Sequence, residues 1–296
     1  MSFKSGFVTI IGRPNVGKST LFNSFLNTKL AIVSPKAQTT RNTIEGIYTT
    51  DTEQIIFIDT PGIHKPKHKL GKYMTNAAIN TLNWVDLIIF MVNVEESIGS
   101  GDKYILNLLQ NVEVPVILAL NKIDRITKEE LVNKINEYKN YYNFLHIVPI
   151  SALKNKNVNT LLNLIKESLP EGPKYYSGEE ITTRPEKFII SEIIREKILQ
   201  FTQEEVPHSV ACIVEKIEEK KTVTKIYATI VVERASQKGI IIGEQGKMLK
   251  KIGTHSRRDI EAFLGRKVFL ELFVKVEKKW REKEKYLTEF GYKKDE

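Results

Sequence analysis

The chain has 296 residues, a net charge of +9 and an apolar fraction of 41%, which suffices for packed cores and excludes a disordered protein. Its single cysteine, Cys212, excludes an internal disulfide framework and a cysteine-based zinc site, so we expect a reducing, cytoplasmic setting. No apolar run approaches the roughly 20 residues that a membrane span needs. The length favours two domains.

Short apolar runs alternate with helix-like stretches from Gly6 to about Leu169. The sequence predicts strands at residues 7–11, 55–58, 87–92, 116–120 and 145–150. Their nearly continuous Ile, Val, Leu and Phe content indicates burial on both faces. We therefore expect an α/β fold, a mostly parallel sheet with helices on both faces.

The first strand leads into a loop that is typical of phosphate binding. It reads Gly12-Arg13-Pro14-Asn15-Val16-Gly17-Lys18-Ser19, followed by Thr20 and a helical run. In the pattern G-x-x-x-x-G-K-[ST] backbone N–H groups converge on phosphate oxygens, Lys18 reaches the β and γ phosphates, and Ser19 offers its hydroxyl to Mg²⁺. The alternative is a chance glycine turn, which the strand-loop-helix context disfavours.

Two later segments supply the expected switch residues. In SPKAQTTR (residues 34–41) Thr40, with Thr39 in reserve, could give its hydroxyl to Mg²⁺. The next segment, Asp59-Thr60-Pro61-Gly62, ends a strand, so Asp59 would hold a water of the Mg²⁺ shell and the Gly62 N–H would meet the γ-phosphate. Residues 63–72, which begin with Ile63, are basic and are expected to form the second mobile switch. Both segments are also compatible with plain solvated loops.

A base-reading segment, Asn121-Lys122-Ile123-Asp124, follows the strand at 116–120. The Asp124 carboxylate can accept the N1–H and N2–H₂ of guanine, whereas adenine offers neither donor there, and an unpaired buried carboxylate is costly. Ser151 and Ala152 follow the strand that ends at residue 150, which would place the Ala152 N–H on guanine O6. This set favours GTP over ATP.

Two prolines and a glycine in residues 169–173 interrupt the pattern and suggest a domain boundary. We expect a first domain at 1–172, a linker at 173–185 and a second domain at 186–296. The second domain is predicted to contain a helix at 185–201, strands at 210–217 and 223–232, and a glycine-rich turn at 239–246. A helix at 248–264, a strand at 268–274 and a charged terminal helix at 276–290 complete it.

Positive charge is concentrated in residues 247–285, where 13 basic residues face 6 acidic ones. A surplus of this kind suits a polyanionic partner such as a nucleic acid. A turn followed by a solvated basic helix face is the alternative, because a run of charges is usually that.

The motifs GRPNVGKST, SPKAQTTR, DTPG, NKID and SAL, in this order, resemble those of the Era family of bacterial GTPases. The resemblance covers essentially the whole length. It implies a P-loop GTPase domain with GTP or GDP and Mg²⁺, followed by an α+β type-II KH domain that binds RNA. It further implies that the target is the 3′ region of small-subunit (16S) ribosomal RNA, and that the role is assembly and maturation of the small ribosomal subunit.

In the implied KH domain the segment Gly243-Glu244-Gln245-Gly246 would clamp the backbone of about four unpaired nucleotides. Lys247, Lys250 and Lys251 would meet phosphates, with Arg257 and Arg258 further out. Glu244 departs from the basic or small residue preferred in this turn, which puts the local electrostatics in question.

Two positions bear on catalysis. Ile63 stands where Ras-like enzymes carry a water-orienting glutamine, so intrinsic hydrolysis is expected to be slow. Asn15 matches an asparagine that helps to bind K⁺ in translation-factor-class GTPases, so K⁺ is a candidate cofactor. The alternative is that Asn15 only stabilises the loop through local hydrogen bonds, and the sequence does not favour either role over the other.

Two rival functions remain at this point. One is a constitutive RNA-binding module with a non-switching nucleotide site, which the presence of Lys18 and Asp124 disfavours. The other is a regulatory GTPase peripheral to the inner face of the cell membrane, which would use the basic terminal helix. Leu287 and Phe290 form only a small apolar stripe there. We expect a cytoplasmic monomer with at most weak membrane contact.

Overall fold

The computed structural model describes residues 3–292 and divides into two compact units. The first unit comprises Met1–Ala31, Thr40–Lys67 and Met74–Thr183. The second comprises Arg184–Glu296 together with two earlier segments, Ile32–Thr39 and His68–Tyr73. Residues 173–183, which we expected in a linker, thus belong to the first unit. The outermost ends of the expected domains, residues 1–2 and 293–296, lie outside the described residues.

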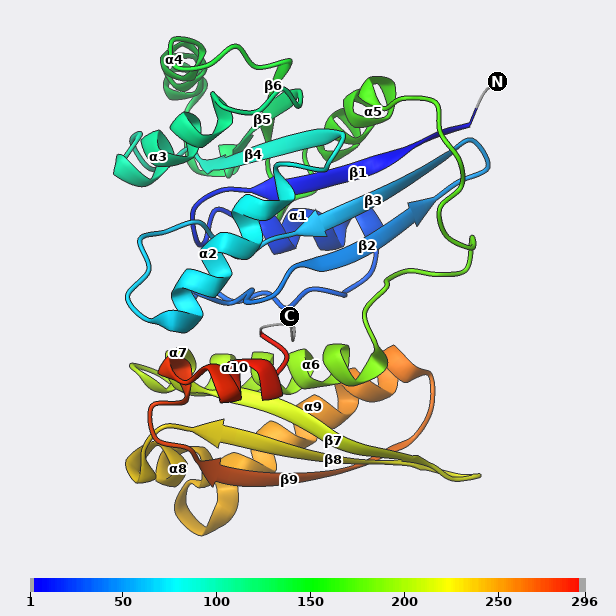
Figure 1. The fold of residues 1–296 in the computed structure, drawn as a ribbon, viewed down its shortest axis with the longest axis vertical. Helices are drawn as coiled ribbons and strands as arrows, with labels where there is room; N and C mark the ends of the chain where they lie inside the picture. Colours follow the sequence, from blue (N-terminus) through cyan, green and yellow to red (C-terminus); the bar gives the residue numbers. More distant parts are fainter. Residues whose placement is uncertain (1–2, 293–296) are drawn as a thin grey trace. The chain divides into compact units, whose positions relative to one another are not determined.

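A six-stranded sheet forms the centre of the first unit, in the order β2-β3-β1-β4-β5-β6 (Figure 1). The strands are β1 (Lys4–Ile11), β2 (Ile44–Thr49), β3 (Glu53–Asp59), β4 (Leu87–Asn93), β5 (Val116–Asn121) and β6 (His146–Ile150). All neighbouring pairs are parallel except β2 with β3. The α/β prediction is confirmed, although the antiparallel edge strand β2 was not predicted.

Helices cover both faces of this sheet (Figure 1). They are α1 (Lys18–Leu26), α2 (Lys69–Thr81), α3 (Ser100–Leu109), α4 (Lys128–Lys139) and α5 (Val158–Ser168), with a short 3₁₀ turn, η1 (Ile123–Arg125). On one face α2, α3 and α4 pack around buried strand residues such as Phe90. On the other, Phe25 of α1 stacks on Phe57 of β3 with ring centroids 4.5 Å apart. Burial on both faces accounts for the continuous apolar content of the central strands.

The second unit contains a three-stranded sheet, β7-β8-β9, in which β7 and β8 are antiparallel and β8 and β9 parallel. Its elements are α6 (Glu186–Phe201), α7 (Val206–Ser209), β7 (Ala211–Glu219), β8 (Thr224–Val232), α8 (Ala235–Ile242), η2 (Glu244–Gly246), α9 (Lys247–Leu264), β9 (Val268–Val276), η3 (Trp280–Glu282) and α10 (Glu284–Glu289). The predicted α+β class of this domain is confirmed, although the helices α7 and α8 were not predicted.

Two expectations for the second unit were wrong. Gly239 lies inside α8, so the glycine turn begins only at Gly243. The terminal helix expected at 276–290 is broken, because β9 extends to Val276 and the buried Trp280 anchors the chain by donating from Nε1 to the Ser209 carbonyl at 2.8 Å. Leu287 is only 3% exposed. Of the two apolar residues considered for lipid contact, Leu287 and Phe290, the first therefore packs inside the protein.

The chain that follows α5 runs along the edge of the six-stranded sheet. The Ile47 N–H donates to the Ile181 carbonyl at 3.0 Å, and Thr182 Oγ1 donates to the Glu45 carbonyl at 2.6 Å. The Gln54 amide exchanges hydrogen bonds with the backbone of Tyr176 at 2.9 and 3.0 Å. Residues 176–182 thereby cover the exposed edge of β2. Within residues 3–292 no helix is both long and apolar enough to span a membrane.

Candidate nucleotide and nucleic-acid sites

The phosphate loop joins the end of β1 at Ile11 to the start of α1 at Lys18. Gly17 adopts a φ of 106°, and a Cβ atom there would lie 2.4 Å from Asn121 Nδ2. A side chain at this position would meet both backbone strain and a clash. The expected strand-loop-helix context of the motif is confirmed.

The Lys18 ammonium is buried beneath this loop, with the residue only 6% exposed. Its Nζ donates to the carbonyl oxygens of Gly12, at 3.3 Å, and Arg13, at 3.0 Å. Burial lowers the pKa of Lys18 to about 8, against a smaller raising effect of the Asp59 charge. The site thus holds a partly desolvated cation that a phosphate group would neutralise.

The three expected Mg²⁺ residues come together. Ser19 Oγ lies 2.8 Å from Thr40 Oγ1 and donates to Asp59 Oδ2 at 2.7 Å, while Thr40 Oγ1 is 3.1 Å from the same Asp59 oxygen. Burial raises the pKa of Asp59 to about 6, partly offset by Lys18. The reserve candidate, Thr39, instead donates its hydroxyl to the Lys36 carbonyl at 2.6 Å.

This donor set fits Mg²⁺. Asp59 is fully buried, and among the described residues its Oδ1 has no hydrogen-bond partner. Hydroxyl and carboxylate oxygens are the ligands that Mg²⁺ prefers, and the ion keeps several waters and substrate phosphates rather than an all-protein cage. Among the described residues, no group of three or more His, Cys, Asp or Glu is arranged to hold a metal ion.

The segment after β3 packs tightly against the phosphate loop. A Cβ atom on Gly62 would lie 2.6 Å from Pro14 N, so only glycine permits this approach. The Ile63 N–H donates to the Gly12 carbonyl at 3.0 Å, and the Ile63 side chain is 1% exposed, within the apolar cluster of α2, α3 and α4. Thr60, beside Pro61, donates its hydroxyl to the Ile10 carbonyl at 2.6 Å. The side chains of Thr60 and Ile63 therefore serve the fold.

The Arg13 side chain turns to α3 and to the loop that precedes it. Its guanidinium pairs with Asp102 at 2.8 Å and with Glu96. The hydrogen bond and charge of Asp102 raise the pKa of Arg13. Arg13 thus fixes the phosphate loop to a neighbouring element, and only its backbone remains for a phosphate role.

The guanine-reading residues gather at the ends of β5 and β6. Asn121 joins them to the phosphate loop, because its Nδ2 donates to the Val16 carbonyl at 2.7 Å and its Oδ1 accepts from the Ala152 N–H at 2.9 Å. Asp124 is exposed rather than buried, as we had expected from the sequence, and a hydrogen bond from the Ser151 side chain lowers its pKa. Lys122 pairs with Glu95 at 3.4 Å. The Ala152 N–H, expected on guanine O6, is therefore already engaged by Asn121, and an O6 contact would have to share it.

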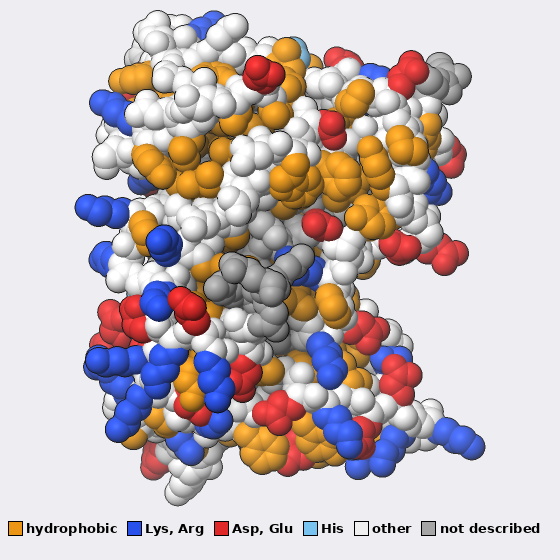
Figure 2. All heavy atoms as spheres, viewed as in Figure 1, with side chains coloured by type: hydrophobic (Ala, Val, Ile, Leu, Met, Phe, Trp, Pro, Cys, Tyr) orange, Lys and Arg blue, Asp and Glu red, His pale blue; other side chains and the backbone are white. Residues whose placement is uncertain are grey.

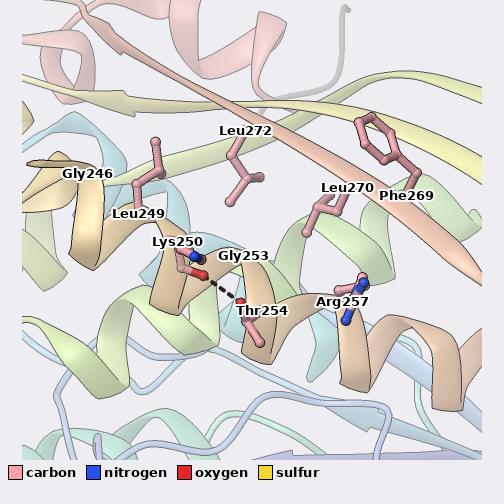
Figure 3. A pocket seen from close by; sticks show the side chains of 9 residues that line it. All are labelled: Gly246, Leu249, Lys250, Gly253, Thr254, Arg257, Phe269, Leu270 and Leu272. Carbon is pink, nitrogen blue, oxygen red and sulfur yellow. Dashed lines mark hydrogen bonds between the residues drawn. The ribbon is translucent and has the colours of Figure 1, made fainter.

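A groove lies between α9 and β9 in the second unit, with a volume of about 480 Å³ (Figure 3). Of the expected RNA-binding residues Gly246, Lys250 and Arg257 line it. The other lining residues were not predicted: Leu249, Gly253, Thr254, Phe269, Leu270 and Leu272. Leu249 extends from α9 on the side of the groove near Leu272, and Leu270 lies further along β9, while Phe269 lies on the other side of this strand (Figure 3). Because successive side chains of a β-strand point to opposite faces, the sequence could have indicated that Phe269 lies on the other face from Leu270 and Leu272.

Basic side chains, with acidic ones between them, flank an apolar surface on the second unit (Figure 2). Figure 2 shows hydrophobic side chains over β8 and β9 with Lys and Arg side chains on both sides. Phe269 is 49% exposed. Lys247, Lys250, Lys251 and Arg257 are all exposed, but the Lys251 ammonium lies 4.3 Å from the ring centroid of Phe201 on α6 rather than in the groove. Gly243, Glu244 and Gln245 form the turn that precedes α9, outside the groove lining.

Comparison with known families divides the chain in the same way. Residues 7–122 match a family described as 50S ribosome-binding GTPase, and residues 205–281 match the KH domain. The first match covers the phosphate loop, both switch segments and the start of the base-reading segment. The second covers the groove between α9 and β9.

Two solved structures are similar over almost the entire chain. One is Era in complex with MgGDPNP and nucleotides 1506–1542 of 16S ribosomal RNA, with 42% identity, a TM-score of 0.95, and coverage of 98% of this chain and 99% of that one. The other is an Aquifex aeolicus Era variant bound to GDP·AlF₄⁻, with 41% identity, a TM-score of 0.93 and the same coverage.

Proposed function

Because this chain belongs to the Era family of GTPases, we propose that its second unit binds the 3′ region of small-subunit ribosomal RNA under the control of GTP. The chain is a GTPase that uses GTP, GDP and Mg²⁺. The proposed role is that of a GTP-controlled assembly factor of the small ribosomal subunit. RNA would be held while GTP is bound and released after hydrolysis.

The residues that would bind the nucleotide are assigned from the geometry of the first unit. The backbone of residues 12–20 would surround the phosphates, and Lys18 would lie against the β and γ phosphates. Ser19 and Thr40 would bind Mg²⁺ directly and Asp59 through water, and the ion when bound would neutralise phosphate charge. Asp124 would select guanine. Since the Ile63 side chain is buried in the core, no side chain at that position can orient water, so slow intrinsic hydrolysis is proposed.

The groove between α9 and β9 is the observation that carries the RNA-binding proposal. Its apolar lining from Leu249, Leu270 and Leu272 suits unstacked bases, and the exposed ring of Phe269, on the other side of β9, offers a separate stacking surface (Figure 3). Lys250 and Arg257 stand at the same groove to meet phosphates. The 16S ribosomal RNA in the related Era structure supports this choice of ligand.

Control by GTP is supported by two segments of the first half of the chain that belong to the second unit. That unit includes Ile32–Thr39 and His68–Tyr73, which contain parts of both expected switch segments. Segments of this kind are ordered by the γ-phosphate and released on hydrolysis. A change in their order would therefore act directly on the packing of the RNA-binding unit.

We expect Gly246→Asp to weaken binding of a single-stranded oligonucleotide from the 3′ end of 16S ribosomal RNA by about tenfold or more, because a carboxylate would face the phosphates. Affinity would be measured with GDP and with a non-hydrolysable GTP analogue. Wild-type protein should bind more tightly with the analogue. Equal RNA affinity in the two states would contradict control by GTP.

Gly265→Asp is the matched control for this experiment. Gly265 ends α9, whereas Gly246 begins it, and the two residues have similar φ values of 65° and 75° with open space where a Cβ would stand. Both variants add the same charge and similar backbone strain at an end of one helix, although the charge is favourable at the N-terminus of a helix and unfavourable at its C-terminus. RNA binding that falls equally in both would place the clamp away from Gly246.

We also propose that K⁺ accelerates hydrolysis through Asn15, which adopts a φ of 64° in the phosphate loop. Single-turnover hydrolysis should be faster in KCl than in NaCl at equal ionic strength. Asn15→Ala should remove that difference while GDP affinity is largely kept. Equal rates of the wild-type protein in the two salts would leave Asn15 with a local structural role.

A membrane-associated function is less well supported than RNA binding. In the described chain Leu287 is buried, and Phe290 stacks on Tyr286 with ring centroids 5.5 Å apart. These contacts leave α10 little apolar surface for lipid. We propose a cytoplasmic monomer that acts on the small ribosomal subunit.

A further inference from the structure

Helix α6 carries charged side chains that the nucleotide site and the RNA groove do not use. Four charged residues near the middle of this helix are buried, with exposures of 6% or less: Glu192, Arg195, Glu196 and Lys197. Burial of a charge costs several kcal/mol unless it is paired and hydrogen-bonded. Such a concentration on one helix calls for specific partners.

The partners include the segment Ile32–Thr39, which belongs to the same unit. Arg195 Nη2 donates to the Thr39 carbonyl, and Glu196 Oε1 accepts from the Val33 N–H at 3.0 Å. Lys36 Nζ donates to the carbonyls at the end of α6, those of Leu199 and Thr202. Helix α6 therefore holds this segment near both of its ends and in the middle.

The guanidinium of Arg195 is itself fixed. Glu192, one helical turn earlier, accepts from Arg195 Nε at 2.8 Å and from Nη2 at 2.5 Å. This two-point contact orients the planar guanidinium and leaves Nη2 directed at the Thr39 carbonyl. Glu192 and Arg195 thus act as one structural unit.

The carbonyl of Thr39 and the N–H of Thr40 belong to one rigid peptide plane. The orientation of that plane sets the position of the Thr40 Cα atom, from which the side chain extends, and Thr40 Oγ1 lies beside Ser19 and Asp59. We propose that Arg195, oriented by Glu192, is a positioning residue for GTP: it fixes the Thr39 carbonyl and so holds the Thr40 hydroxyl at the Mg²⁺ position. This inference rests on the role proposed above for Thr40.

The effect should be confined to the triphosphate. Threonine ligation by a switch segment belongs to the state with a γ-phosphate, whereas GDP is held by the phosphate loop and the base-reading residues. A loss of Arg195 should therefore weaken binding of a GTP analogue and raise the Mg²⁺ concentration that this binding requires. GDP affinity should stay close to that of the wild type.

The test uses the full chain with Glu192→Met and Arg195→Met together, because replacing a whole buried ion pair by apolar residues is often neutral for stability. Arg195→Lys, which keeps the charge but loses the planar fork, is a milder second variant. We expect the double variant to bind a fluorescent non-hydrolysable GTP analogue about tenfold more weakly, the loss expected for one hydrogen bond to a charged group. Equal losses for GDP and the analogue, or none for either, would overturn the inference.

A second ion pair of the same unit provides the control. Arg281 pairs with Glu233 at 2.6 Å and also donates to a backbone carbonyl, that of His208. Glu233→Met with Arg281→Met removes a comparable arrangement remote from Ile32–Thr39 in the sequence. This control should leave the ratio of analogue to GDP affinity unchanged.

Thr40→Ala separates the inference from its premise. If Thr40→Ala leaves analogue binding and its Mg²⁺ dependence unchanged, the role proposed for Thr40 fails. If Thr40→Ala weakens binding but the Glu192 and Arg195 double variant does not, only the inference fails. When Thr40→Ala is combined with the double variant, the losses should be less than additive, since nothing remains for Arg195 to position.

Discussion

Asp124→Asn should lower GTP affinity by about a hundredfold, because the guanine N2 amino group then faces an amide donor and the remaining acceptor for N1–H is uncharged. An aspartate is ionised at neutral pH, and the Ser151 side chain lowers the pKa of Asp124 further, so the carboxylate can accept from both N1–H and N2–H₂. An asparagine amide presents one acceptor and one donor. It matches xanthine, which carries a carbonyl oxygen where guanine has the N2 amino group.

The affinity of Asp124→Asn for xanthosine triphosphate should therefore rise while that for GTP falls. Competition against a fluorescent GDP would give both values for each protein. Asp51→Asn, which changes an exposed carboxylate in the turn between β2 and β3, is a suitable control. Undiminished GTP affinity in Asp124→Asn would remove the base-reading assignment.

Lys18→Met should lower the affinity for GTP and GDP by about a hundredfold or more, since its ammonium is the buried cation of the phosphate loop. Methionine has a similar length and keeps the apolar contacts of the side-chain stem. Equilibrium binding of fluorescent GDP measures the change. Lys128→Met, at an exposed position that begins α4, should bind normally.

Although Lys18→Met should weaken nucleotide binding, it should stabilise the fold of the nucleotide-free protein. Burial lowers the pKa of Lys18 from 10.5 to about 8, so the charged form destabilises the folded state. That cost is fully present below about pH 8 and disappears as the pH rises towards 10.5. At pH 7 Lys18→Met should therefore raise the free energy of unfolding by about 1–3 kcal/mol, measured by urea denaturation. A loss of stability at pH 7 would show that the ammonium already has sufficient partners.

The motifs of the first unit could be predicted because they depend on local sequence. A strand followed by a glycine loop and a helix places Lys18 and Ser19, and the ends of parallel strands bring Asp59 to the same edge of the sheet. Strand β2 was missed, because its sequence IEGIYT is short and only partly apolar, and its place is fixed by pairing with β3. The engagement of the Ala152 N–H by Asn121 also depends on three-dimensional proximity.

The second unit shows where sequence patterns fail. A helix rich in Glu, Arg and Lys is usually read as a solvated face, but α6 buries Glu192 and Arg195 because another segment of the chain packs on them. The terminal residues were read as one basic helix, although Trp280 is buried and interrupts it. In both cases tertiary burial outweighs local composition.

The chain that covers β2 has a practical meaning for dissecting this protein. An open strand edge offers unpaired N–H and C=O groups to other molecules and favours aggregation. The carbonyl of Ile181 and the hydroxyl of Thr182 occupy that edge. A shortened chain that stopped at Gly172 would leave the edge of β2 open to pairing with another molecule. A chain that continued through Thr183 would keep this edge covered and should aggregate less.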